Sequence, residues 1–240
     1  MSKELKLGRI AGPFDTALLA QGFVVSPLNT VEKRDSEERR VIIVDLSWPC
    51  GHSVNDPISS DFYLGEPLVL RYPTIDYIVD AVVTLGRGCH LYKRDRQFPV
   101  DPKDYPFLGY TRDNHFYFDT VLTMGLSSAA ISCQRSTSAV AWIASQQGRL
   151  GFNYLDDFIG VSPALTAHTD FQVLSDLLSS LGLESPEKLC PPSRVMTCLG
   201  VELGTEAITL SVNPDRLCEI ERLLVHRTLF PRGYSRNFFG

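Results

Sequence analysis

Apolar residues recur with the period of an α-helix in four stretches of the chain. The first runs from Pro73 to Leu85 and stops at Gly86; its apolar residues are Ile75, Ile78, Val79, Val82 and Val83. The second begins at Ser127 or Ser128 and ends near Gln147. The residues that follow its helical period are Ile131, Arg135, Ala139, Trp142 and Ile143. Two further helices are predicted over 171–181, before Gly182, and over 215–225.

Short runs of β-branched and aromatic residues between these helices predict strands. They are expected over 41–44 and 89–93, on both sides of a turn at Asp156-Asp157 within 150–161, and over 196–203 and 208–212. Residues 1–40, which include the charge run Glu32–Arg40, are expected to be mostly loop. Because strands and helices mix without strict alternation, the pattern predicts an α+β fold with helices backing an antiparallel sheet.

Composition places the chain among globular proteins. It has 240 residues, of which 44% are hydrophobic and 21% charged, which excludes a disordered or fibrous chain. Neither an apolar run long enough to cross a membrane nor a secretory signal is present, so we expect an intracellular protein with no membrane partner. Six cysteines without a C-x-x-C pair indicate reduced thiols.

The net charge of −5 is unusual for a free-standing protein that binds nucleic acid. Such proteins usually carry a basic stripe that neutralises phosphates. Any polyanionic partner must therefore be held by local basic clusters or with the help of protein outside this chain.

The most distinctive chemistry lies in the pair Asp156-Asp157, which stands between two apolar dipeptides. A carboxylate pair in an apolar strand turn must stay hydrated or bind cations, since burying a bare charge is costly. Asp95 ends another strand-like segment, and if the two strands are neighbours, three carboxylates meet at one sheet edge. Such a cluster suits two metal ions and phosphoryl transfer. A simple hairpin turn, or an unrelated metal-dependent hydrolase that uses the same acids, is the alternative.

The segment Tyr154-Leu155-Asp156-Asp157 resembles the Y-x-D-D motif of reverse transcriptases, and other segments agree with that family in the same order. They are residues 39–47 with 51–56, Lys93-Arg94-Asp95 with Phe98-Pro99-Val100, residues 122–130, Lys188, and Leu199-Gly200-Val201. The combination is similar to retrotransposon enzymes, in particular to those of the tyrosine-recombinase (DIRS-like) group.

The resemblance implies a reverse-transcriptase-like palm, an antiparallel sheet backed by helices, together with fingers and a partial thumb. On that basis residues 1–85 would form a fingers-like region and residues 86–212 the palm. Residues 213–226 would begin the thumb helix, and residues 227–240 would be a divergent tail.

The resemblance also implies a reaction, RNA-directed DNA polymerisation. Asp95, Asp156 and Asp157 would be the catalytic, metal-binding residues and would hold two Mg²⁺ ions, with Mn²⁺ as an alternative. The substrates would be an RNA or DNA template-primer and deoxynucleoside triphosphates.

Further residues would contact these substrates by the same resemblance. Arg39 or Arg40 and Lys188 would lie near the triphosphate, and Gly125, which has no Cβ, would let the backbone approach the nucleotide. The primer and template would be contacted by Tyr154, Leu199 and Gly200.

The chain departs from the family pattern after Asp95. Only Arg96, Gln97 and Phe98 precede Pro99, where the family has a longer stretch with an aromatic residue that excludes a ribose 2′-hydroxyl. An internal deletion there, with a truncated and divergent C-terminus, leaves two interpretations open. The chain is either a polymerase domain or a catalytically inactive relative with at most weak nucleic-acid binding. Trp48 and Trp142 are expected to pack in the core or against loops.

Overall fold

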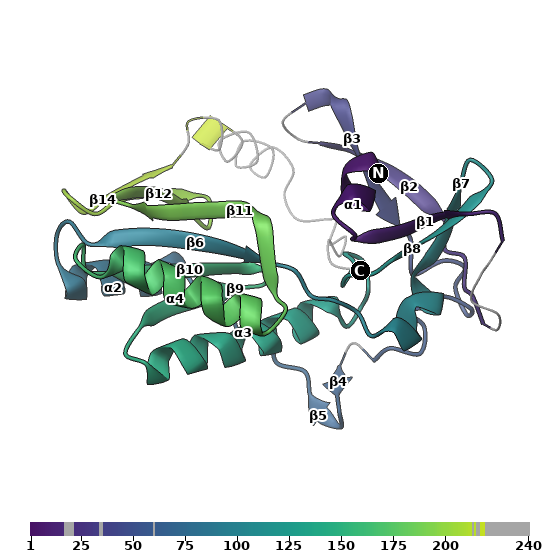
Figure 1. The fold of residues 1–240 in the computed structure, drawn as a ribbon, viewed down its shortest axis with the longest axis horizontal. Coiled ribbons are helices and arrows are strands. Elements are labelled where there is room, and N and C mark those ends of the chain that lie inside the picture. Colours follow the sequence, from purple (N-terminus) through teal and green to yellow (C-terminus); the bar gives the residue numbers. More distant parts are fainter. Residues whose placement is uncertain (17–21, 34–35, 60, 213, 215–216, 219–240) are drawn as a thin grey trace, which may run out of the picture.

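The structure, a computed structural model, describes residues 1–16, 22–33, 36–59, 61–212, 214 and 217–218. At 31–33, 36–42, 184 and 186–188 the description covers the backbone alone. The helix expected over 215–225, the start of the thumb expected over 213–226 and the tail expected over 227–240 lie outside the described residues, apart from Pro214, Leu217 and Cys218. Figure 1 shows two groups of elements side by side, which we call the sheet lobe and the N-terminal lobe.

The sheet lobe is built on a four-stranded antiparallel sheet. Its strands are, in spatial order, β11 (Glu184–Ser193), β6 (His90–Arg96), β10 (Asp157–Ser162) and β9 (Leu150–Tyr154). Successive side chains of a strand point to opposite faces, so Leu91 and Tyr92 on β6 enter different cores. The predicted antiparallel sheet is confirmed, and β6 extends beyond the expected strand so that it includes Asp95.

Helices pack on both faces of this sheet. On one face lie α3 (Ala129–Gln146) and α4 (Ala167–Ser180), whose apolar residues pack on Tyr92 and Phe158. On the other face lies α2 (Ile75–Leu85), capped by Thr74 and Gly86, which packs on Leu91. The predicted helices over 73–85 and 127–147 are confirmed, whereas α4 begins earlier than the expected 171.

A second, three-stranded sheet lies on the same face as α2. Its strands are β12 (Val195–Cys198), β13 (Val201–Gly204) and β14 (Thr209–Val212). The single strand expected over 196–203 is wrong, because Leu199 and Gly200 both have positive φ and turn the chain between β12 and β13. In the sequence, a single glycine is the only sign of this turn, and one glycine inside a strand-like run does not predict a turn by itself.

The N-terminal lobe combines the start of the chain with residues from its middle. Its elements are α1 (Ser2–Lys6), β1 (Ile10–Phe14), β2 (Leu28–Lys33), β3 (Ser36–Val44), the 3₁₀-helix η1 (Pro102–Leu108), β7 (Gly109–Arg112) and β8 (His115–Asp119). The expectation that residues 1–40 are mostly loop is wrong, because β1 pairs with β8 and β2 with β3. The partners of β1 are far along the sequence, so local pattern could not reveal that pairing.

The remaining hairpin consists of β4 (Phe62–Tyr63) and β5 (Glu66–Pro67). No helix in the described part of the chain is both long and apolar enough to pass through a membrane.

Three apolar side chains lie outside the packing expected for them. Trp48 and Trp142 are 61% and 64% exposed, so the expectation that they pack in the core or against loops is wrong. On α2, Val83 is exposed and Ala81 is buried instead. On α3 the buried residues Val140 and Ala144 face the sheet, and Trp142, two positions from each, lies on the opposite side of the helix.

Candidate active site

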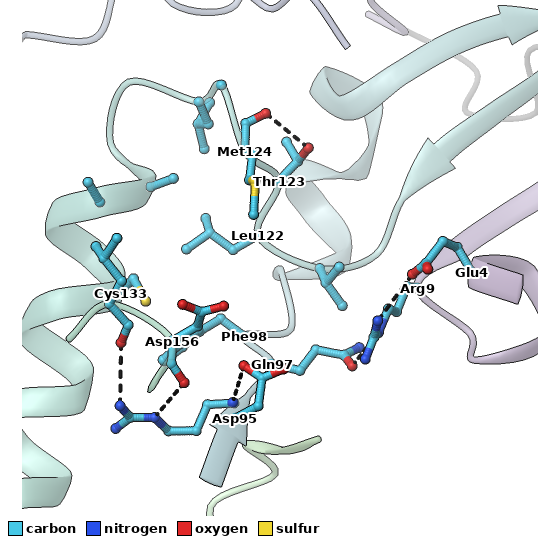
Figure 2. Close-up of a pocket in the computed structure, with 17 residues that line it drawn as sticks. Glu4, Arg9, Asp95, Gln97, Phe98, Leu122, Thr123, Met124, Cys133 and Asp156 are labelled. Carbon is cyan, nitrogen blue, oxygen red and sulfur yellow. Dashed lines mark hydrogen bonds and ion pairs between the residues drawn. The ribbon is translucent and has the colours of Figure 1, made fainter. Parts of the chain in front are cut away.

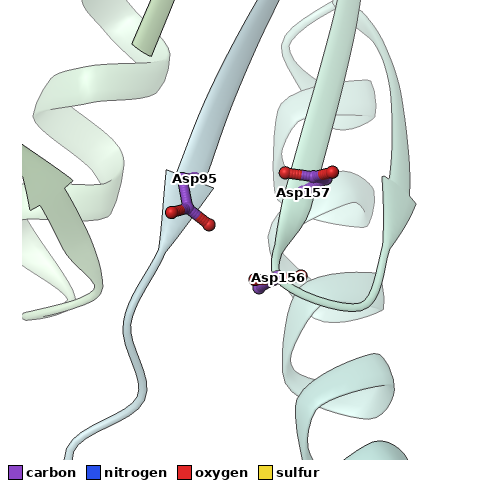
Figure 3. A group of neighbouring side chains, drawn as sticks. All are labelled: Asp95, Asp156 and Asp157. Carbon is purple, nitrogen blue, oxygen red and sulfur yellow. The ribbon is translucent and has the colours of Figure 1, made fainter. Parts of the chain in front are cut away.

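Strand register brings the three aspartates together. Asp95 on β6 is paired directly with Asp157, the first residue of β10, and Asp156 lies in the turn that joins β9 to β10 (Figure 3). The three carboxylates each offer an oxygen within 4.8 Å of the others. The central geometric expectation from the sequence, that Asp95 lies within shared cation reach of the Asp156-Asp157 pair, is met.

The cluster combines a buried carboxylate with two half-buried ones. Asp95 is only 6% exposed, whereas Asp156 and Asp157 are intermediate. Lys93, on the same face of β6 as Asp95, places its Nζ 2.6 Å from Oδ2 of Asp157. Among the described residues this is the only group of three or more acids, histidines or cysteines that come within common reach of one metal ion.

The turn that carries Asp156 is strained and firmly held. Leu155 has a φ of 49°, a left-handed conformation that costs a non-glycine residue about 1 kcal/mol. The turn residues are Leu155 and Asp156, one position earlier than the sequence suggested, because Asp157 already pairs with Tyr154. A strained backbone of this kind persists only where neighbouring groups fix it.

Gln134 fixes the turn from α3. Its Oε1 accepts a hydrogen bond of 3.0 Å from the Leu155 N–H, and its Nε2 donates to the carbonyls of Arg71 and Asn153. The side chain is buried, at 5% exposed. A buried amide that makes several hydrogen bonds is costly to remove, since its partners would be left without them.

Arg96 fixes the same turn from β6. Its backbone N–H and Nε donate to the Asp156 carbonyl at 3.0 and 3.2 Å, and Nη2 donates to the Leu155 carbonyl at 3.4 Å. Burial lowers the pKa of its guanidinium to about 10, with the opposing Coulombic effect of the three aspartates smaller. Arg96 therefore remains charged at neutral pH and adds a positive charge beneath the acidic cluster.

A cavity of about 470 Å³ opens beside Asp95 and Asp156. Figure 2 shows Asp156 and Phe98 on one side of it and Leu122 and Met124 on the other. Most of its lining is apolar, including Leu126, Ala129 and Ala130. An apolar pocket that ends at a few charged groups is the usual form of a small-molecule site.

Gly125 lines this cavity, in the loop formed by residues 121–126. Its φ of 100° is open to glycine alone, and its carbonyl accepts a hydrogen bond of 2.8 Å from Asn55 Nδ2. Asn55 Oδ1 also accepts from the Ser127 N–H at 2.8 Å. One asparagine from the N-terminal lobe therefore holds the C-terminal end of this loop.

Asp119 supports the same loop from behind. It shares a side-chain hydrogen bond with Thr123 and accepts one of 3.4 Å from the Tyr110 hydroxyl. Burial raises the pKa of its carboxyl to about 6, and these hydrogen bonds oppose that rise. Asp119 is thus a partly buried acid with a pKa of about 6 that contacts the loop at Thr123.

The donor set at the cluster fits hard divalent ions. All three side chains offer carboxylate oxygens, which Mg²⁺ and Mn²⁺ prefer. Cys133 also lines the cavity, but burial raises the pKa of its thiol to about 11, so it stays protonated and is a poor ligand at neutral pH.

Comparison with known proteins finds similarity in the fold but none in the sequence. No family model matches the chain, and no curated protein matches it. Two structures of the foamy viral protease-reverse transcriptase in complex with double-stranded DNA match 91% and 99% of the chain, both with a TM-score of 0.59, at 15% and 14% identity. A crystal structure of a Prototype Foamy Virus protease-reverse transcriptase mutant matches 98%, with a TM-score of 0.54 at 18% identity.

The fold is reverse-transcriptase-like. The three matches cover 34%, 48% and 30% of the viral chains, so this chain spans about a third to a half of the structures it matches. At these identities the likeness is one of architecture, a mixed arrangement of helices and antiparallel sheet.

Within this reverse-transcriptase-like fold, the residues predicted to contact primer and template lie at or next to two turns. Tyr154 directly precedes the acidic turn, and its ring centroid is 5.1 Å from that of Tyr72. Leu199 and Gly200 form the β12–β13 turn, and Leu199 packs on the core beneath the Asp95 face of the sheet.

The basic residues predicted near the triphosphate are placed by backbone only. Lys188 lies on β11, next to Leu189, which pairs with Arg94 of β6. Arg39 and Arg40 lie on β3 in the N-terminal lobe. The side chains of all three lie outside the described residues, and their roles stay predictions.

Sequence reasoning did not identify Lys93, Arg96, Gln134 or Asn55 as parts of the site. A signal existed for Gln134, a polar residue in phase with the buried positions Ile131 and Thr137 of its helix. For Lys93 and Arg96 the signal was their position on either side of a candidate metal ligand.

The short connection after Asp95 links β6 to the segment that precedes η1. The Gln97 N–H donates to the Leu183 carbonyl at 3.1 Å, the Phe98 carbonyl accepts from Leu122, and Pro99 bridges to Val121. Phe98 lines the cavity. The connection is therefore built into the sheet lobe and the cavity wall.

Proposed function

We propose that the chain is the reverse transcriptase domain of a retroelement, an RNA-directed DNA polymerase that extends a primer by nucleotidyl transfer. The observation that carries this proposal is the position of the acids. Asp95, Asp156 and Asp157 meet at the edge of an antiparallel sheet, beside a cavity, in a reverse-transcriptase-like fold. Retroelement origin, including a DIRS-like source, rests on the sequence motifs alone.

Asp95, Asp156 and Asp157 would hold two Mg²⁺ ions, or Mn²⁺ in their place. When bound, such ions supply positive charge to the attacking primer hydroxyl and to the departing pyrophosphate. The chain's own contribution is placement, since register fixes Asp95 against Asp157 while Gln134 and Arg96 fix the turn that carries Asp156.

The cavity would take the incoming deoxynucleoside triphosphate. Gly125 would let the loop approach it closely, and Arg39, Arg40 and Lys188 would supply charge to its phosphates. The primer and template would lie along the surface formed by Tyr154, Leu199 and Gly200.

The regional assignment rests on the sequence motifs that resemble this family. Residues 1–85 would be fingers, residues 86–212 palm, and residues 213–226 the beginning of a thumb. Two of the similar structures hold double-stranded DNA, which supports a nucleic-acid partner for this fold. Because the chain carries a net charge of −5, we expect its binding to be weak at physiological salt.

The test is primer extension by the purified full chain on an RNA template with a DNA primer, with Mg²⁺ or Mn²⁺ present. We expect incorporation that is lost in Asp156→Asn and retained in the control Asp101→Asn, an acid on the 3₁₀-helix cap outside the cluster. Incorporation that survives in Asp156→Asn would contradict the proposal.

A second candidate function is an inactive reverse-transcriptase-like protein that binds nucleic acid weakly. The short connection Arg96–Phe98 favours it, because a displacement of about 1 Å at a reacting centre can cost two orders of magnitude in rate. Salt-sensitive binding that is unchanged in Asp156→Asn, without incorporation, would support it. Metal-dependent hydrolysis of a small phosphate ester without primer would instead indicate a hydrolase.

A further inference from the structure

Lys93 forms an ion pair with the acidic cluster at a position that is mostly shielded from solvent. Its Nζ is 2.6 Å from Oδ2 of Asp157, and both side chains are only 25% exposed. Lys103, by comparison, also contacts an aspartate, Asp101 at 2.9 Å, but is 83% exposed. The Lys93–Asp157 pair is therefore largely withdrawn from solvent, where charges interact more strongly.

Strand geometry explains the contact. Lys93 and Asp95 are two residues apart on β6, so their side chains lie on the same face of the sheet. Asp157 pairs with Asp95, which makes Lys93 its diagonal neighbour across the two strands. The register that assembles the acids also places the ammonium against one of them.

Electrostatics gives the ammonium a role. Three carboxylates within 4.8 Å of one another repel strongly, and the Lys93 charge offsets part of that repulsion. Arg96 contributes a second charge, but its guanidinium donates to main-chain carbonyls of the turn. Among the residues whose side chains are described, Lys93 is thus a cation in direct contact with a carboxylate oxygen of the cluster.

A metal ion and the Lys93 ammonium would compete for the Asp157 carboxylate. Mg²⁺ and Mn²⁺ bind carboxylate oxygens at about 2.1 Å, so an ion shared by Asp95 and Asp157 would come close to the Lys93 charge. The two cations would repel, and both would draw on the same carboxylate. Metal binding must therefore displace Lys93 from Asp157 or take place against its charge.

We propose that Lys93 is an internal counter-ion of the acidic cluster that weakens divalent-metal binding and stabilises the metal-free protein. This inference rests on the proposed metal site. Lys93 acts as a positioning residue through Asp157 and does not itself contact the reacting atoms.

The test is titration of the full chain with Mn²⁺ alone, followed by the electron paramagnetic resonance signal of the free ion. In Lys93→Met, which keeps an apolar side chain of similar length, we expect a dissociation constant lower by about tenfold. Lys93→Arg keeps the charge and should bind as the wild type does. Lys103→Met, which removes the exposed pair, should also leave the affinity unchanged.

Thermal unfolding gives an independent readout on the same proteins. Without metal, Lys93→Met should melt below the wild type, because Asp157 loses its counter-charge. Saturating Mn²⁺ should raise the melting temperature of Lys93→Met by more than that of the wild type, as tighter binding requires. Lys93→Arg should follow the wild type in both conditions.

The outcomes distinguish this inference from the proposed function. If the wild type binds Mn²⁺, Asp156→Asn loses it, and Lys93→Met binds equally or more weakly, the metal site stands and the counter-ion role is wrong. If neither the wild type nor Lys93→Met binds Mn²⁺, both the metal site and the counter-ion role are wrong.

Discussion

On one side of the cavity beside Asp95 and Asp156, the β9–β10 turn is fixed by buried polar groups from α3 and β6. On the other side, residues 121–126 are held by Asn55 through hydrogen bonds that are open to solvent, and by the partly buried Asp119. Water can replace an exposed hydrogen bond, whereas a buried partner left alone pays its full desolvation cost. We therefore expect the turn to tolerate change much less than the loop.

The largest effect is expected for Gln134→Ala. It leaves the Leu155 N–H and two carbonyls without their buried partner and releases a strained turn, so the free energy of unfolding should fall by about 3 kcal/mol. Primer extension should fall by about 100-fold as the turn shifts. Denaturant unfolding and single-nucleotide incorporation measure these effects. Gln146→Ala, exposed on the same helix, should change neither; equal losses in both variants would contradict the special role of the turn.

An intermediate effect is expected from the titration of Asp119. Its pKa in the folded protein, about 6, lies above the usual value of 3.8, so the folded state holds a proton that the unfolded state loses. The free energy of unfolding should therefore decrease by about 2 kcal/mol as pH rises from about 4 to 6 and change little above that.

Asp119→Asn removes this titration while keeping the shape of the side chain. Unfolding of the wild type and the variant, measured at several pH values, should differ by a slope confined to the window between about pH 4 and 6. A wild-type curve parallel to that of Asp119→Asn throughout would show that folding does not raise the pKa of Asp119.

The smallest effect is expected for Asn55→Ala. Its hydrogen bonds to Gly125 and Ser127 are exposed, so the free energy of unfolding should fall by about 1 kcal/mol or less. Because Gly125 lines the cavity, the KM for the nucleotide should rise more than kcat falls. Asn55→Asp keeps the acceptor for the Ser127 N–H, so its free energy of unfolding and its KM should lie between those of the wild type and Asn55→Ala. A loss as large as that of Gln134→Ala would remove the contrast between the two walls.

The sequence predicted the parts of the site that depend on local pattern. Apolar periodicity located α2 and α3, and the motifs of Asp95 and Asp156-Asp157 identified acids that strand pairing brings together. Such features follow from residues close in the chain. The register of β6 against β10, two neighbouring strands of the sheet, completes the cluster.

The sequence did not predict what depends on distant partners. β1 pairs with β8 across about half of the chain, so local pattern could not reveal that strand. Arg96 and Gln134 act through main-chain carbonyls and N–H groups of a turn, so their positions in the sequence did not by themselves identify these contacts. The exposure of Trp142 likewise depends on which helix face meets the sheet.

The most direct test of the acidic cluster is anomalous scattering from crystals of the full chain grown with Mn²⁺. We expect a peak between β6 and β10, within about 2.1–2.3 Å of carboxylate oxygens from Asp95 and from at least one residue of the Asp156-Asp157 pair. A structure that lacks a peak there, or shows Asp95 turned away while manganese binds elsewhere, would contradict the central claim that strand register builds a divalent-metal site.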